Sequence, residues 1–212
     1  EVAHKDSTGQ GGVIGPGDVQ WMTAGSGILH EEFHSEGFAK TGGTLNMVQL
    51  WVNLPSQLKM TKPGYQAILD KQIPVIDLQN AAGQGRIIAG KFAGHEGPAH
   101  TFTPMNVVDL KLKKGEFTLP VPEGWNISLV VLKGAVEAGD GVVAKDAQML
   151  MFGNQGQDIQ IHVLEDSIAL LLSGEPIDEP IVGYGPFVMN TKEEIAQAMQ
   201  DFNSGRFGKI AN

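Results

Sequence analysis

Apolar residues along the chain form short runs that glycine, proline or asparagine interrupt, a pattern typical of β-strands joined by turns. Four runs are rich in Val, Ile and Leu and predict strands, at residues 86–89, 107–112, 127–132 and 168–172. Weaker apolar patterns at residues 13–29 and 45–52 also predict strands. Residues 55–69 instead predict a linker that forms a short helix from Tyr65 to Leu69.

The last part of the chain has a different periodicity. Thr191 is followed three residues later by Glu194, which is the signature of a capping box, and Ile195, Met199 and Phe202 recur at helical spacing. The pattern predicts one helix from Lys192 to Phe202, ended by Ser-Gly. We expect this helix to pack back on a barrel through its three apolar residues.

Composition supports a turn-dense, strand-rich protein, because 28 of the 212 residues are Gly, 11 are Pro and only 18% are charged. The net charge of −9 disfavours direct binding to nucleic acid, which requires clustered Lys and Arg. The chain has no Cys, so disulfides and thiolate metal ligands are excluded. With no signal peptide and no apolar run long enough for a membrane, we expect a cytoplasmic protein without membrane contact.

His30 and Glu32 are the residues that carry candidate chemistry. They lie two positions apart after the turn-rich run Gly-Pro-Gly-Asp, and on a strand that spacing places both side chains on one face. An imidazole nitrogen and a carboxylate oxygen side by side would form half of a first-row transition-metal site. We expect their metal-binding atoms to lie within about 4 Å of each other, since both must reach one ion. On spacing alone, a turn-bonded His and a solvated Glu are the alternative.

Residues 16–32, which contain the runs Trp-Met-Thr-Ala-Gly and Gly-Ile-Leu-His, closely resemble the signature of the pirin family. Residues 50–55 and 63–66 are similar to the segment that follows it in pirins. Residues 174–190 and 201–207 resemble the pirin C-terminal block, so the resemblance covers almost the whole chain.

The resemblance implies an all-β bicupin, with two stacked β-barrels and a C-terminal helix. We expect an N-terminal cupin barrel over residues 1–60, a linker and crossover over 61–90, and a C-terminal cupin barrel with the terminal helix over 91–212. A second Asp-x-Gln-apolar-apolar run, from Asp146 to Leu150, echoes the one from Asp18 to Met22 and fits this duplication. The second copy has no His-x-Glu pair, so we expect no metal there.

Pirins hold one divalent metal with three His and one Glu, and His30 and Glu32 match two of these ligands. The other two come from an upstream His-Pro-His motif that has no counterpart in residues 1–212, so we expect low occupancy of the ion in this chain. His4 is the nearest substitute, at a position that pirins do not use as a ligand. The resemblance favours Fe(II), with Ni, Mn or Zn as alternatives.

Two functions remain open. Some pirins resemble quercetin 2,3-dioxygenases, which open a flavonol ring with O2 and release carbon monoxide. In that case Glu32 would be both a metal ligand and the base that accepts the flavonol's hydroxyl proton. The alternative is a non-enzymatic, metal- or redox-responsive protein that binds a transcription factor or a metabolic enzyme.

The remaining histidines have simpler explanations. His34, His95 and His100 lie in segments that predict loops, and His162 alternates with Ile161 and Val163 in a way that predicts an outward-facing position.

Overall fold

The computed structural model describes residues 1–139 and 141–210, and these residues form two compact units. Unit 1 contains residues 1–70 and 177–212, and unit 2 contains residues 71–176. The division differs from the expected boundaries at residues 60 and 90. Residues 61–70 and the C-terminal segment with its helix group with the N-terminal strands, and residues 71–90 are part of unit 2.

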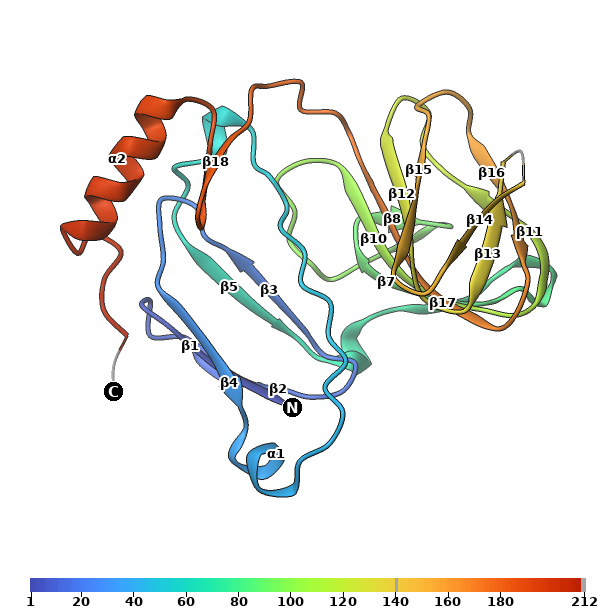
Figure 1. Ribbon diagram of the computed structural model, residues 1–212, viewed down its shortest axis with the longest axis horizontal. Coiled ribbons are helices and arrows are strands. Elements are labelled where there is room, and N and C mark those ends of the chain that lie inside the picture. The colour runs from blue at the N-terminus through green and yellow to red at the C-terminus, as the bar shows by residue number, and fades with distance from the viewer. Residues whose placement is uncertain (140, 211–212) are drawn as a thin grey trace. The chain divides into compact units, whose positions relative to one another are not determined.

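Unit 2 contains two large sheets (Figure 1) and a small two-stranded sheet formed by β8 and β9. The six-stranded sheet has the order β15-β12-β17-β10-β7-β6, and the four-stranded sheet has the order β11-β16-β13-β14. The strands are β6 (Val75–Asp77), β7 (Gly83–Ala89), β8 (Lys91–Phe92), β9 (His95–Glu96), β10 (Met105–Leu112), β11 (Gly115–Pro120), β12 (Asn126–Lys133), β13 (Ala135–Ala138), β14 (Val142–Lys145), β15 (Gln148–Phe152), β16 (Asp158–Val163) and β17 (Ser167–Gly174). Two short 3₁₀ helices precede β7, namely η2 (Asp70–Gln72), which begins at the last residue of unit 1, and η3 (Gln79–Ala81).

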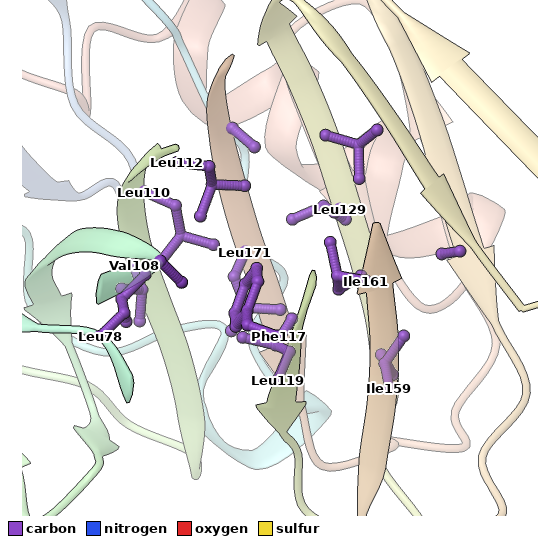
Figure 2. Close-up of a cluster of buried hydrophobic side chains, with 14 of the residues drawn as sticks. Leu78, Val108, Leu110, Leu112, Phe117, Leu119, Leu129, Ile159, Ile161 and Leu171 are labelled. Carbon is purple, nitrogen blue, oxygen red and sulfur yellow. The ribbon is translucent and has the colours of Figure 1, made fainter. Parts of the chain in front are cut away.

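An apolar core fills the space between the two sheets of unit 2. The labelled side chains of β10, β11, β12, β16 and β17 point into this space (Figure 2). Leu110, Leu119, Leu129 and Val163 have no exposed surface. The four runs that predicted strands are β7, β10, β12 and β17, and these four strands are consecutive neighbours in one sheet, in the order β12-β17-β10-β7.

Unit 1 has smaller sheets. Its strands are β1 (Val2–Asp6), β2 (Gly11–Ile14), β3 (Val19–Thr23), β4 (His30–His34), β5 (Gly64–Ile68), β18 (Val182–Tyr184) and β19 (Phe187–Met189), and its helices are α1 (Glu36–Thr41), η1 (Ser56–Leu58) and α2 (Lys192–Asn203). One antiparallel sheet has the order β2-β1-β4, β3 pairs with β5, and β18 pairs with β19. The described strands thus confirm an all-β fold with a C-terminal helix.

The C-terminal helix α2 begins at the predicted residue, ends one residue after the predicted Phe202 and has the predicted capping box. Thr191 Oγ1 accepts a hydrogen bond from the Glu194 amide at 3.1 Å, and the Glu194 carboxylate accepts one from the Thr191 amide at 2.9 Å. The helix packs on the β18–β19 hairpin, with Ile195 buried. Of the other two residues expected to pack, Phe202 is 49% exposed but its ring contacts that of Phe187 on β19 at a centroid distance of 6.3 Å, and Met199 is 37% exposed.

Polar contacts connect the C-terminal segment to residues 53–59 of unit 1. The Glu179 carboxylate accepts hydrogen bonds from the Ser56 amide at 2.6 Å and from the Asn190 side chain at 3.0 Å. These bonds lower the pKa of Glu179, with the Ser56 amide as the main cause. Lys59 is buried and donates to Asn53 Oδ1 at 2.7 Å. Burial lowers the pKa of Lys59, while Glu179 and Glu194 act in the opposite direction.

Two sequence predictions in unit 1 are wrong. Residues 45–52 form no strand, because no other strand among residues 1–139 and 141–210 pairs with them. Their large apolar side chains are therefore exposed, with Trp51 at 66%. The predicted helix from Tyr65 to Leu69 is strand β5 over most of its length, because Tyr65 and Gln66 pair with Met22 and Trp21 of β3.

We predict that Leu129→Ala lowers the free energy of unfolding of unit 2 by about 2–5 kcal/mol, because the side chain is fully enclosed and its removal leaves a cavity. Met151→Ala on the neighbouring strand is the matched control, since this side chain is 76% exposed and its loss should change stability by less than about 0.5 kcal/mol. Urea denaturation measures both changes when it is followed by tryptophan fluorescence in a Trp21→Phe, Trp51→Phe background, where the signal comes from Trp125, which packs on this core. Equal losses in the two variants would contradict the assignment of the core.

Candidate functional site

The register between β1 and β4 gathers four polar side chains of unit 1. His4 lies opposite Glu32 and Asp6 lies opposite His30 in this antiparallel pair. Alternation along each strand puts His4 and Asp6 on one face of β1, and His30 and Glu32 on one face of β4. Residues that are directly opposite in a ladder project to the same side of the sheet, so all four share one face.

His30 and Glu32 converge as expected from their spacing. His30 Nε2 lies 3.7 Å from Glu32 Oε1, within the expected 4 Å, and the side chains are 19% and 26% exposed. The two groups are therefore side by side and still reachable from solvent.

Two side-chain hydrogen bonds join the β2-β1-β4 sheet to the β3-β5 pair. Gln20 Nε2 on β3 lies 2.9 Å from His30 Nε2 on β4, and the Tyr65 hydroxyl on β5 lies 2.7 Å from His4 Nε2 on β1. In the neutral imidazole tautomer protonated at Nδ1, the amide and the hydroxyl are the donors. The facing sides of these two sheets are thus linked by polar groups.

His4 is buried in this cluster, with 2% of its surface exposed. Its ring centroid is 4.7 Å from that of Tyr65 and 6.1 Å from that of His30. His4 Nδ1 is buried without a hydrogen-bond partner among the described residues. Burial lowers the pKa of His4, the neighbouring His30 adds to this effect, and Asp6 and Glu32 oppose it. Burial has the opposite effect on the pKa of Tyr65, which it raises, because it disfavours the charged phenolate.

Asp6 stabilises the turn that follows β1. Its Oδ1 accepts hydrogen bonds from the Thr8 hydroxyl at 2.6 Å, the Thr8 amide at 2.8 Å and the Gln10 amide at 3.1 Å. Burial opposes ionisation of this carboxyl, but the hydrogen bonds outweigh it and lower the pKa of Asp6. Asp6 thereby fixes the β1–β2 turn beside His30.

The side chains on this face match a divalent-metal site only in part. Imidazole nitrogen and carboxylate oxygen suit a first-row transition metal in kind. However, within residues 1–139 and 141–210 no three His, Asp or Glu side chains converge to hold an ion. His4, the substitute ligand considered from sequence, has its Nε2 on Tyr65 instead. His30 and Glu32 would therefore supply two donors to an ion, and no third His, Asp or Glu among the described residues converges with them.

Sequence reasoning identified His30 and Glu32 but missed Gln20 and Tyr65. Gln20 belongs to the Asp-x-Gln run, whose role in the site was not apparent from the spacing. The sequence predicted a linker helix at Tyr65 and therefore did not indicate that Tyr65 lies on a strand whose side chain reaches β1. Of the other histidines, His34 and His95 are exposed and His162 is half-buried, while His100 contacts Phe102 through its ring.

The all-β chain with two β units and a terminal helix fits a bicupin, and the comparisons with known proteins support this fold. The family model for the pirin C-terminal cupin domain matches residues 107–208, and the pirin model matches residues 1–52. The chain belongs to the pirin family.

Relatives support this assignment along almost the whole chain. A Pseudomonas aeruginosa protein named "putative quercetin 2,3-dioxygenase" is 54% identical, over 98% of this chain and 72% of its own length. A pirin-like protein of Solanum lycopersicum is 39% identical, over 97% of this chain and 69% of its own. The crystal structure of a quercetin 2,3-dioxygenase from Acinetobacter baumannii has a TM-score of 0.94 and 53% identity, covering 99% of this chain and 73% of that one. In the described part of this chain, no helix has the length and apolar character needed to cross a membrane.

The lowered pKa of His4 predicts a pH dependence of stability. The unfolded chain binds a proton on His4 near its ordinary pKa of 6.5, whereas the folded chain resists it. The contribution of neutral His4 to the free energy of unfolding is therefore fully present above about pH 6.5. It is lost as the pH falls through the lower pKa that His4 has in the folded state. Asp6 titrates below its ordinary 3.8 and does not contribute to this window.

We expect the free energy of unfolding of metal-free protein to decrease between pH 7.5 and pH 5, and His4→Gln to make that decrease shallower. Denaturant unfolding at a series of pH values measures both. His95→Gln, a change at an exposed histidine, serves as the control and should leave the slope unchanged. An identical slope in wild type and His4→Gln would contradict the assignment.

Proposed function

We propose that this protein is a metal-dependent dioxygenase of the quercetin 2,3-dioxygenase type, acting on quercetin or a related flavonol. The observation that carries the proposal is the convergence of His30 Nε2 and Glu32 Oε1 at 3.7 Å on one face of β4. The names of the 54% and 53% identical relatives support the same reaction.

In this proposal, His30 and Glu32 hold one divalent ion, Fe(II) in the first place and Ni, Mn or Zn as alternatives. The bound ion would supply a Lewis acid that makes a coordinated flavonol hydroxyl more acidic. Glu32 would accept the hydroxyl proton, and His30 would hold the ion beside this carboxylate. The Gln20 amide lies 2.9 Å from His30 Nε2, so an ion bound through this nitrogen would have to displace the amide.

A second candidate function is a non-enzymatic, metal- or redox-responsive protein that binds a transcription factor or a metabolic enzyme. Residues 45–52 favour it, because they expose a row of large apolar side chains, and the chain has no charged residue between Thr41 and Lys59. Exposed apolar surface of this kind often marks a contact with another protein.

We expect His30→Ala to lower the affinity for Fe(II) by at least about 100-fold, because it removes a direct ligand, and direct ligands matter at least as much as the groups that orient them. The measurement is metal titration of protein expressed from its complete gene, with His95→Ala as the matched control at an exposed histidine. Stoichiometric metal retained by His30→Ala would show that the ion is held elsewhere.

We expect Glu32→Gln to lower kcat for quercetin by about 100- to 10,000-fold, as for the loss of a general base. Glu31→Gln is the matched control, since Glu31 is the adjacent carboxylate on the opposite face of β4 and is exposed. O2 uptake and carbon monoxide release are measured together. A metal-loaded protein that turns over no flavonol but binds a protein partner only with metal present would refute the enzyme and support the second candidate.

A further inference from the structure

Residues 24–29 form the loop that leads into β4, and this loop sets the backbone position of His30. The Ser26 amide donates to the Thr61 carbonyl at 2.8 Å, and the Gly27 amide donates to the Ala24 carbonyl at 2.9 Å. At the end of the loop, Leu29 pairs with Ser7. The Ser7 amide donates to the Leu29 carbonyl at 2.9 Å, and the Leu29 amide donates to Ser7 Oγ at 3.0 Å. His30 is the next residue, so its backbone position depends on these contacts.

The end of the chain packs on this loop within unit 1. The half-buried Phe207 ring lies against Gly27, so closely that a Cβ on this glycine would overlap ring atoms. Gly27 also has a φ of +123°, a conformation that side chains disfavour. One residue further, a Cβ on Gly208 would lie 3.2 Å from Ser7 Cβ. Phe207 thus packs on the loop that precedes His30, and Gly208 lies close to Ser7, the residue that follows β1.

The position of Phe207 is itself fixed by the rest of the C-terminal segment. Its ring makes edge-to-face contacts with Phe187 on β19 and Phe202 on α2, at centroid distances of 6.3 and 6.0 Å. The preceding residue is held as well, since the Arg206 amide donates to the Asp201 carbonyl at 3.0 Å and the Arg206 guanidinium pairs with the Asp201 carboxylate at 2.6 Å. Figure 1 shows this segment in red, following α2.

We propose that Phe207 and Gly208, which we call the C-terminal clasp, are positioning residues that fix the His30 imidazole by holding Gly27 and Ser7. A shift of Gly27 changes the start of β4 three residues later, and with it the 2.9 Å contact between His30 and Gln20 and the 3.7 Å approach of Glu32. Misplacement of a ligand by about 1 Å is enough to impair a catalytic site. The catalytic value of the clasp rests on the proposed function, whereas its effect on His30 does not.

The test compares amide hydrogen exchange and histidine ring NMR in wild type, Phe207→Ala, Phe207→Leu and Phe207→Tyr. We expect Phe207→Ala to raise the exchange rate of the Leu29 amide by about tenfold or more and to shift the His30 ring nitrogen signals. Phe207→Tyr keeps the aromatic face and should restore both. Phe207→Leu keeps apolar bulk and should give the same changes to a smaller extent, which also tests the proposal if the alanine variant does not fold.

Met199→Ala is the control for general damage to α2, because Met199 is 37% exposed and lies on the same helix. It should leave the Leu29 exchange rate and the His30 signals unchanged.

A direct test of the contact combines Gly27→Ala with Phe207→Ala. Gly27→Ala should lower the melting temperature more when Phe207 is present, since the overlap with the ring then adds to the backbone strain at positive φ.

The proposal is overturned if the Leu29 amide and the His30 ring are unaffected in Phe207→Ala and Phe207→Leu, or if Met199→Ala changes them equally. These measurements use metal-free protein and require no activity. A separate titration with Fe(II) would show weaker binding in Phe207→Ala only if His30 is a ligand. Absence of Fe(II) binding in every variant of protein expressed from its complete gene, wild type included, would remove the proposed function and leave the positioning result intact.

Discussion

The antiparallel register of β1 and β4 determines the chemistry available in unit 1. It sets His4 against Glu32 and Asp6 against His30, so two imidazoles and two carboxyl groups share one face of a three-stranded sheet. A slip by one residue would turn β4 over, because side chains alternate between faces, and would present Glu31 and Phe33 in place of His30 and Glu32. The turn bonds of Asp6 and the paired hydrogen bonds between Ser7 and Leu29 stabilise the register at the end of β1.

The two units achieve stability differently, and the difference suits a division of roles. Unit 2 has a continuous apolar core between its two sheets, which supplies most of the free energy that a domain of this size needs. Unit 1 joins its sheets through Gln20–His30 and His4–Tyr65, polar contacts that contribute little net free energy but cost much when one partner is lost. A polar interior is therefore less stabilising than an apolar one. It is also what the metal-dependent function proposed above would require of unit 1.

Features that depend only on residues close together in the sequence were predicted correctly. The capping box of α2, the buried strands of unit 2 and the shared face of His30 and Glu32 follow from local periodicity, and the structure confirms them. Residues 45–52 show the limit of such reasoning, since an apolar run forms a strand only if another strand pairs with it. Tyr65 is the converse case. Its segment lacks a clear strand pattern, yet pairing with Met22 makes it part of β5.

The contact between Phe207 and Gly27 could not have been found from periodicity, because it joins positions that are almost the full length of the chain apart. Its origin lies in the path of the backbone. Residues 107–208 match one family model, yet residues 177–208 group with the N-terminal strands as part of unit 1. The chain therefore leaves unit 1, completes unit 2 and then returns to cover the loop in front of His30. Because the segment after residue 176 packs within unit 1, a change near the C-terminus acts first on the N-terminal site. The apolar core of unit 2, made of residues 76–171, does not depend on that segment for any of its buried side chains.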